Sequence, residues 1–298
     1  MHTRGGDESA RAQRRRGRMQ QRLTQAGAWT SLPGELEHHI LVITLGAHVR
    51  SSWRLILQDV TWLHALGVRP VLVQGVSLAL LGEPRAGLED LRTTLCGQVN
   101  QELLTLACGL GERAVALSGI DGQTVRAHAA SPNQGSIGQV HAVNPHLIEV
   151  LCAQGYVPII APLGQGPEGT TLLIDADHFA AHLACALDAE ILVALDSAPG
   201  VQRPDGSLIG ELDAGEGRRL LEAGAIGDEQ VPRVSACLGA LVAVPRVHIA
   251  GGDESHALLH ICLQGQPKGT RLVRLPDPAS LFWRLSPAQD AAETPHTP

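Results

Sequence analysis

Short apolar segments alternate with longer segments of helical periodicity along most of this chain. Residues 40 to 45, ILVITL, are almost continuously apolar, whereas residues 51 to 66 carry apolar side chains three and four positions apart. The first pattern predicts a buried strand and the second an amphipathic helix. Because this alternation continues to about residue 273, we predict an α/β fold with a mostly parallel central sheet covered by helices on both faces.

The other predicted elements follow the same order. Further strands are expected at residues 69–75, 113–119, 156–163, 190–195 and 245–250, and further helices at residues 88–110, 176–187, 232–241 and 255–261. Three strands run into glycine, at Gly46, Gly75 and Gly119. Ligands in open parallel sheets bind beyond the carboxyl ends of the strands, so these glycines predict one crevice. The alternative is that each glycine only allows a tight turn.

The two ends of the chain differ from its centre in composition. Residues 1–37 are a polar arm, residues 38–275 form the predicted domain, and residues 276–298 are a polar tail that we expect to be disordered. Six arginines against Asp7 and Glu8 give residues 1–18 a charge of +4, which leaves −11 of the total of −7 for the rest. Such an arm could contact nucleic acid or a membrane surface. We favour a disordered arm or a start at Met19.

Composition argues for a soluble cytoplasmic protein without membrane spans. The longest apolar runs have the length of strands, far short of the roughly 20 residues that cross a membrane. The arm lacks the apolar segment of a secretory signal. Six cysteines lie scattered in apolar segments without a C-x-x-C pair, which predicts buried, reduced thiols.

The common ligand-binding motifs are absent or unconvincing. There is no P-loop and no G-x-S-x-G motif. GQGPEG at residues 164–169 has dinucleotide-binding spacing, but Pro167 and the strand-like TTLLI after it predict a turn instead of a helix. His178 and His182 lie one helical turn apart, and we interpret them as packing residues because no further ligand is near in sequence. We therefore predict no metal site.

Several blocks together resemble one known family. They are SIGQVHAVNPHLIEVLCAQGYVPIIAPLG, DADHFAAHLACALDAEILVAL, APGV, VPRVSACLGAL and RVHIAGG, followed by HALLHICL and GTRLV. In this order, over residues 38 to 273, they are similar to the acetylglutamate kinase branch of the amino acid kinase family. The resemblance implies a three-layer αβα sandwich, usually a homodimer. It also implies MgATP-dependent phosphorylation of the side-chain carboxylate of N-acetyl-L-glutamate, a step of arginine biosynthesis.

The resemblance also implies a set of site residues. Asp177 matches the aspartate that organises the site, Arg233 stands at the position of a catalytic lysine on a late helix, and Thr44 stands at the position of a second catalytic lysine. The expected cofactor-binding positions are Gly46, Ala47, Gly75, Asp196 and Ser197. The expected substrate-binding positions are Arg85, Asn144 and Asp175.

This chain departs from the family pattern at the positions that would carry charge. Both lysines are replaced, and Asp228 and Glu229 stand where the family has a glycine pair. The only lysine of the chain is Lys268, so Arg233 fits a general replacement of lysine by arginine that keeps a positive charge. Thr44 keeps none. The connection after Gly75 is shorter than in the family and lacks the usual substrate arginine, for which Arg85 could substitute.

Two hypotheses follow from these departures. The first is a degenerate member, a pseudokinase that binds an amino acid, an acyl amino acid or a related kinase without transferring phosphate. The alternative is an active kinase that uses Arg233, with Arg50 or Arg54 supplying charge, on N-acetylglutamate or a related amino-dicarboxylate. Loss of one preorganised charge costs about 10²- to 10³-fold in rate, and several are lost here. We therefore favour the first hypothesis and treat ATP binding as an open question.

Overall fold

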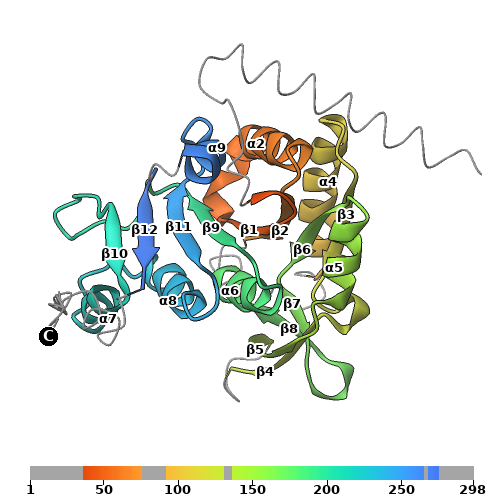
Figure 1. Cartoon of the computed structure of the whole chain (residues 1–298). Helices are drawn as coiled ribbons and strands as arrows, with labels where there is room; N and C mark the ends of the chain where they lie inside the picture. Colours follow the sequence, from red (N-terminus) through yellow and green to blue (C-terminus); the bar gives the residue numbers. More distant parts are fainter. Residues whose placement is uncertain (1–35, 76–91, 131–135, 265–267, 275–298) are drawn as a thin grey trace, which may run out of the picture.

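The computed structural model describes residues 36–75, 92–130, 136–264 and 268–274. The predicted tail, Arg85 and all but the last two residues of the predicted arm lie outside these ranges. Eight strands form one sheet in the order β10-β12-β11-β9-β1-β2-β6-β3 (Figure 1). Their bounds are β1 (Ile40–Leu45), β2 (Arg69–Gln74), β3 (Ala114–Ser118), β6 (Val157–Ala161), β9 (Ile191–Asp196), β10 (Glu211–Asp213), β11 (Arg246–Gly251) and β12 (Thr270–Val273).

The central sheet is mostly parallel, as predicted. β1 pairs in parallel with both β2 and β9, and β11 pairs in parallel with β9. Only β12 runs antiparallel to its inner neighbour β11, and β10 follows the direction of β12. The carboxyl ends of β1, β2 and β9 therefore meet at one edge of the sheet.

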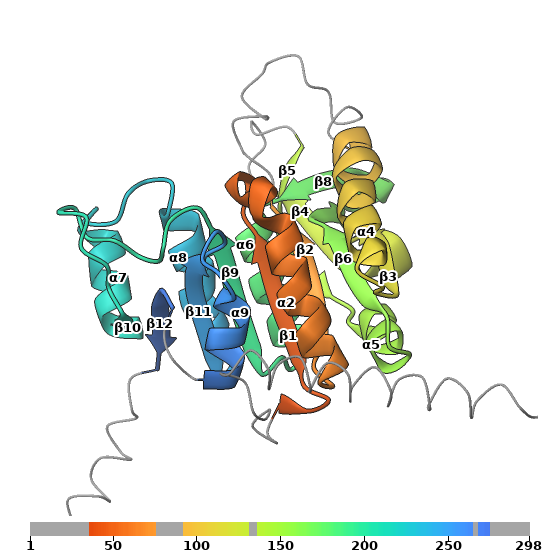
Figure 2. The ribbon, with the colours of Figure 1, turned by 90° about the horizontal axis from the view of Figure 1, so that it is seen from above.

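Helices cover both faces of the sheet, which makes three layers (Figure 2). One face carries α2 (Trp53–Ala65), α4 (Asn100–Gly109) and α9 (Ala257–Leu259), and the other α5 (His146–Ala153), α6 (Ala176–Ala186) and α8 (Val231–Ala240). Alternation along β1 explains the two cores, because Leu41 and Ile43 pack on the α2 side while Val42 packs with α6. The expected αβα sandwich is confirmed.

A second, smaller sheet closes on itself beside the main one. It consists of β4 (Val125–Ala129), β5 (Ile137–Val143), β7 (Leu163–Gln165) and β8 (Thr171–Ile174). The segment GQGPEG joins β7 to β8 as an antiparallel hairpin, with the N–H of Gly166 donating to the carbonyl of Thr170 at 2.7 Å. The prediction of a turn there is confirmed.

Sequence periodicity missed some elements and simplified others. It did not predict β4, β5, β7, β10, β12, α5 or α7 (Ala214–Glu222). The described part of the predicted long helix begins with a π-helical segment, η4 (Thr93–Val99), and short 3-10 turns occur at η2 (Ala47–Ser52), η5 (Asp121–Gln123) and η6 (Pro167–Gly169). A second π-helical segment, η7 (His260–Gln264), follows α9. Cys152, Cys237 and Cys262 are buried as predicted, but Cys96 and Cys185 are only half-buried and Cys108 is exposed, so the prediction is wrong for Cys108. No helix in the described ranges is long and apolar enough to cross a membrane.

All three glycines at the strand ends are required by close packing, and a Cβ at Gly119 would lie 2.2 Å from the carbonyl oxygen of Leu163. The N–H of Gly46 donates to the carbonyl of Leu195 at 2.7 Å, and the N–H of Gly75 donates to the carbonyl of Leu45 at 2.5 Å. A Cβ at Gly75 would overlap that carbonyl oxygen, and a Cβ at Gly46 would lie 2.6 Å from Asp196 Oδ1. Close approach of β1, β2 and β9 therefore explains Gly46 and Gly75 without a ligand.

We predict that Gly75→Ala destabilises the protein by about 1–3 kcal/mol, because the added methyl group forces β1 and β2 apart at their ends. Denaturant unfolding followed by circular dichroism measures the change. The matched control is Gly239→Ala in α8, where the added methyl group meets nothing within 4 Å. That control should be neutral or stabilising by about 0.5–1 kcal/mol. Equal stability of the two variants would contradict the packing explanation.

Candidate functional site

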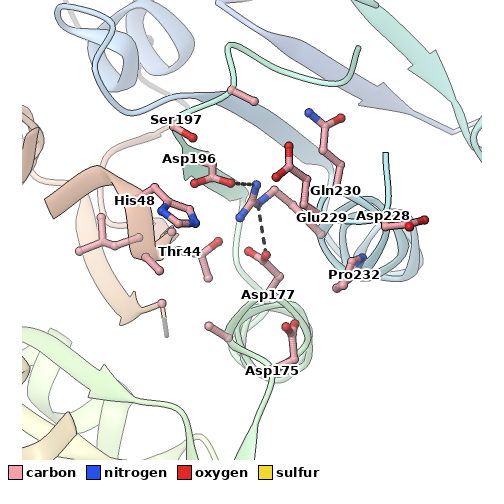
Figure 3. A pocket seen from close by; sticks show the side chains of 17 residues that line it. Thr44, His48, Asp175, Asp177, Asp196, Ser197, Asp228, Glu229, Gln230 and Pro232 are labelled. Atoms are coloured by element: carbon pink, nitrogen blue, oxygen red, sulfur yellow. Dashed lines mark hydrogen bonds and ion pairs between the residues drawn. The ribbon is translucent and has the colours of Figure 1, made fainter. Parts of the chain in front are cut away.

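A cavity of about 270 Å³ opens at the carboxyl edge of the central sheet (Figure 3). Its walls come from the ends of β1 and β9, the first turns of α6 and α8, and the loops after β1, β2 and β9. Three strands were expected to deliver one ligand site at this edge. Gly46 after β1 and Gly75 after β2 line the cavity, but Gly119 after β3 does not. The predicted crevice is therefore confirmed for two of the three strands.

Most residues that the sequence indicated for the site line this cavity. They are Thr44, Gly46, Ala47, Gly75, Asp175, Asp177, Asp196, Ser197 and Arg233. Asn144 is not among the lining residues; it is exposed, and its Oδ1 accepts a hydrogen bond from the N–H of His146 at 3.3 Å. Arg85 lies outside the described residues. His48 and Gln230 also line the cavity and were missed, because no motif marks either position.

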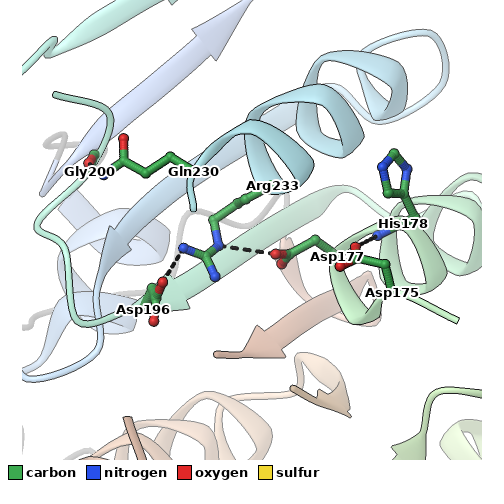
Figure 4. A network of polar contacts seen from close by, with 7 residues as sticks. All are labelled: Asp175, Asp177, His178, Asp196, Gly200, Gln230 and Arg233. Atoms are coloured by element: carbon green, nitrogen blue, oxygen red, sulfur yellow. Dashed lines mark hydrogen bonds and ion pairs between the residues drawn. The ribbon is translucent and has the colours of Figure 1, made fainter. Parts of the chain in front are cut away.

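Arg233 connects two carboxylates across the cavity (Figure 4). Its Nε lies 3.2 Å from Asp177 Oδ2, and its Nη1 donates to Asp196 Oδ2. The three side chains are only 10%, 12% and 14% exposed in the order Arg233, Asp177 and Asp196. This bridge joins α8, α6 and β9, which are far apart in sequence. The single arginine charge is shared between two acids.

The bridge affects its members differently. Burial raises the pKa of Asp177; Arg233 opposes this rise, but the neighbouring Asp175 and Asp196 add to it. Burial disfavours the charged form of Arg233, yet the two carboxylates outweigh burial and its pKa is raised. A raised pKa favours the neutral form of Asp177 but the charged form of Arg233. The two residues differ because Arg233 faces two opposite charges, whereas Asp177 faces one opposite and two like charges.

The first turn of α6 orders the acidic wall of the cavity. Asp175 is the N-cap of this helix, and its Oδ1 accepts a hydrogen bond from the N–H of His178 at 3.0 Å (Figure 4). Asp177 lies in the same first turn, where the helix dipole favours negative charge. Helix capping and the helix dipole therefore account for the presence of two of the acidic residues in the cavity wall.

Thr44 ends up beside Asp177 because of strand alternation. It shares the face of β1 that Val42 presents to α6, and it is only 1% exposed. Its hydroxyl is near enough to lower the pKa of Asp177, an effect smaller than those of burial, Arg233 and Asp175. Even so, Thr44 Oγ1 makes no hydrogen bond of good geometry. A polar but uncharged group therefore occupies this part of the cavity floor.

Other cations of the chain lie elsewhere. Arg50 binds Glu102 and stacks on Trp53 at 5.5 Å, and neither it nor Arg54 lines the cavity. The expectation that one of them could supply charge to the site is wrong for the structure described. Lys268 pairs with Glu254 at 2.5 Å, also outside the cavity. Arg233 is thus the one lysine or arginine among the described lining residues.

Carboxylates dominate the rest of the lining. Asp228 and Glu229 stand exposed in the loop before α8, and Gln230 Nε2 donates to the carbonyl of Gly200 at 3.4 Å, which holds this loop to the one after β9. Within the described ranges, no group of three histidine, cysteine, aspartate or glutamate side chains is arranged to hold a metal ion. The site is acidic without forming a metal cluster there.

A family model and the most similar curated proteins agree on one family. Residues 36–251 match the amino acid kinase family. The chain is 33% identical over 268 residues to the acetylglutamate kinase of Moorella thermoacetica, covering 78% of this chain and 90% of that protein. It is 32% identical over 263 residues to the acetylglutamate kinase of Burkholderia ambifaria, covering 78% and 88%.

Solved structures agree on the fold. N-acetylglutamate synthase of Neisseria gonorrhoeae, solved with coenzyme A and N-acetyl-glutamate, superposes with a TM-score of 0.70 at 23% identity, covering 82% of this chain and 61% of that one. Carbamate kinase of Giardia lamblia bound to AMP-PNP superposes with a TM-score of 0.63 at 14% identity, covering 80% and 99%. At these identities the likeness shows a shared fold.

We predict that Arg233→Met destabilises the protein by about 3 kcal/mol at neutral pH, because two enclosed carboxylates lose their opposite charge. The pKa of Asp177 should then rise further above its ordinary value of 3.8. A carboxyl with a raised folded-state pKa costs stability as pH rises, so the loss should shrink as pH falls toward 4.

Denaturant titrations between pH 4 and pH 8 measure this dependence. Arg54→Met removes an exposed arginine outside the cavity and should change stability by less than about 0.5 kcal/mol at every pH. A loss in Arg233→Met that is independent of pH would show that the bridge is not the cause.

Proposed function

Because this chain belongs to the amino acid kinase family, in its acetylglutamate kinase branch, we propose that it is a degenerate member that binds a small ligand and does not transfer phosphate. Phosphoryl transfer between two anions depends on positive groups that neutralise the transferring phosphoryl. The proposal follows because the described lining of this cavity has one arginine and five carboxylates.

The observation that carries the proposal is that Arg233 is already paired with two carboxylates. Its Nε and Nη1 face Asp177 and Asp196 respectively. A guanidinium held between two carboxylates offers little net charge to a phosphate. Arginine also cannot simply replace a compact lysine ammonium, since its planar group bonds in a fixed fork.

A second positive group is missing from the described lining. Thr44 occupies the position that the family resemblance assigns to a lysine, and Lys268 and Arg50 are paired elsewhere. Five carboxylates remain against one guanidinium. Each lost preorganised charge corresponds to about 10²- to 10³-fold in rate, so the combined loss removes useful catalysis.

The residues present do not fit a nucleoside triphosphate such as ATP. The N–H groups of Gly46 and Gly75 donate to strand carbonyls and are not directed at a ligand. Asp228 and Glu229 place two further negative charges on the lining. We therefore derive no step through MgATP at this site, although the family resemblance implies that cofactor.

One observation favours the alternative of an active kinase. Arg233 keeps a positive charge beside Asp177, and a bound anion could draw it away from one of its two carboxylates. In that case the acceptor would be N-acetylglutamate or a related amino-dicarboxylate. The loops after β1 and β2 would still have to bind phosphate, although the N–H groups of Gly46 and Gly75 donate to strand carbonyls.

The proposal extends to the setting of the protein. We propose a cytoplasmic protein whose working unit is the domain of residues 38–275. It would act as a homodimer or together with a related kinase, with an amino acid or acyl amino acid as its ligand class. Its effect would then be regulatory instead of catalytic.

The decisive experiment is an assay of acyl phosphate formation from ATP and N-acetyl-L-glutamate, trapped with hydroxylamine. We expect no hydroxamate above the level of Asp177→Ala purified in the same way, because the site lacks the charges that transfer requires. The acetylglutamate kinase of Moorella thermoacetica is the positive control. Turnover by the wild type that Asp177→Ala abolishes would overturn the proposal.

A further inference from the structure

The cavity carries a strong excess of negative charge. Asp175, Asp177, Asp196, Asp228 and Glu229 line it against Arg233 alone, a formal charge of −5 + 1 = −4 with His48 neutral. The first turns of α6 and α8 add about half a positive charge each. Protonation of Asp177, whose pKa is raised, would still leave the cavity negative. A ligand that gains from this field must be a cation.

Three buried polar atoms in the cavity wall make no hydrogen bond. One is the donor Arg233 Nε, which instead faces Asp177 Oδ2 at 3.2 Å in an ion pair. The other two are Asp196 Oδ1 and Thr44 Oγ1. Both residues line the cavity, and Thr44 is 99% buried. An unpaired buried acceptor costs about 1–3 kcal/mol. A carboxylate oxygen can only accept, so the missing partner of Asp196 Oδ1 is a hydrogen-bond donor.

A donor that is also a cation is an ammonium or guanidinium group. A divalent metal fits less well, because hard cations take six or more oxygen ligands, and no metal-holding group of three side chains occurs in the described part of the chain. An organic cation needs only convergent acceptors. The cavity volume of about 270 Å³ lies just below the usual range for small-molecule sites, which suits a compact ligand.

A neighbouring cavity gives such a ligand room to extend. It has a volume of about 380 Å³ and shares Asp228, Glu229 and Gln230 with the first cavity. The acidic pair thus lies where the two spaces join. A ligand with two separated positive groups could place one between Asp196 and Thr44 and the other beside Asp228 and Glu229.

We propose that this crevice binds a small organic cation with an ammonium or guanidinium group, held by Asp196, Thr44 and the pair Asp228–Glu229. The inference rests on the proposed function, since it assigns a ligand class to the same cavity. It reverses the charge preference that the family resemblance implies, from an anionic phosphate donor to a cation.

Isothermal titration calorimetry on the full chain with putrescine and with agmatine tests the inference. We expect binding of at least one of them, and no binding of 1,4-butanediol, the neutral analogue of putrescine. Raising the salt concentration should weaken the binding, because screening reduces the attraction between exposed charges. The variant Asp228→Asn/Glu229→Gln should bind about tenfold more weakly, which corresponds to the loss of about 1.4 kcal/mol.

The matched control is Glu211→Gln/Glu222→Gln, which removes two exposed carboxylates outside both cavities. It changes the net charge by the same amount and should leave the affinity unchanged. Both variants are checked for folding by thermal unfolding. Equal weakening in the two variants, or binding of Mg²⁺ while neither amine binds, would overturn the inference.

The hydroxylamine assay separates failure of the two proposals. Absence of turnover together with absence of amine binding would overturn the cation site alone. Turnover that depends on Asp177, together with amine binding, would overturn the loss of catalysis alone. Turnover without amine binding would overturn both.

Discussion

The bridge from Arg233 to Asp177 and Asp196 decides what this crevice can do. It joins α8, α6 and β9 at the edge where a parallel sheet presents its ligand site. Buried ion pairs add little net stability because desolvation offsets attraction. Their chemical effect is larger here, because the bridge occupies the one arginine of the described lining. The remaining carboxylates then set the sign of the field.

The same edge shows why a glycine pattern does not by itself indicate a phosphate site. Gly46 and Gly75 allow β1, β2 and β9 to approach so closely that backbone groups of neighbouring strands bond to one another. That requirement persists whether or not a ligand binds. Strand packing alone therefore explains Gly46 and Gly75, and their presence does not by itself indicate activity.

Fold and chemistry depend on different residues in this protein, which allows one to persist without the other. Alternating apolar side chains of β1 fill the cores on both faces of the sheet, and burial of such side chains supplies most of the stability. The site residues sit at strand ends and in first helical turns, outside those cores. Relatives of about one third identity thus share an architecture that does not settle activity.

The amino-acid sequence by itself determined the order of the main strands and helices, the parallel sheet and the place of the crevice, because local periodicity carries that information. It did not reveal the small sheet of β4 and β5, whose residues are mostly exposed or half-buried and form no continuous apolar run. Only the tertiary structure decided that Arg233 binds Asp196, 37 residues away, and that Asn144 stays outside the cavity. Such pairings depend on which strand ends become neighbours, and no local pattern encodes them.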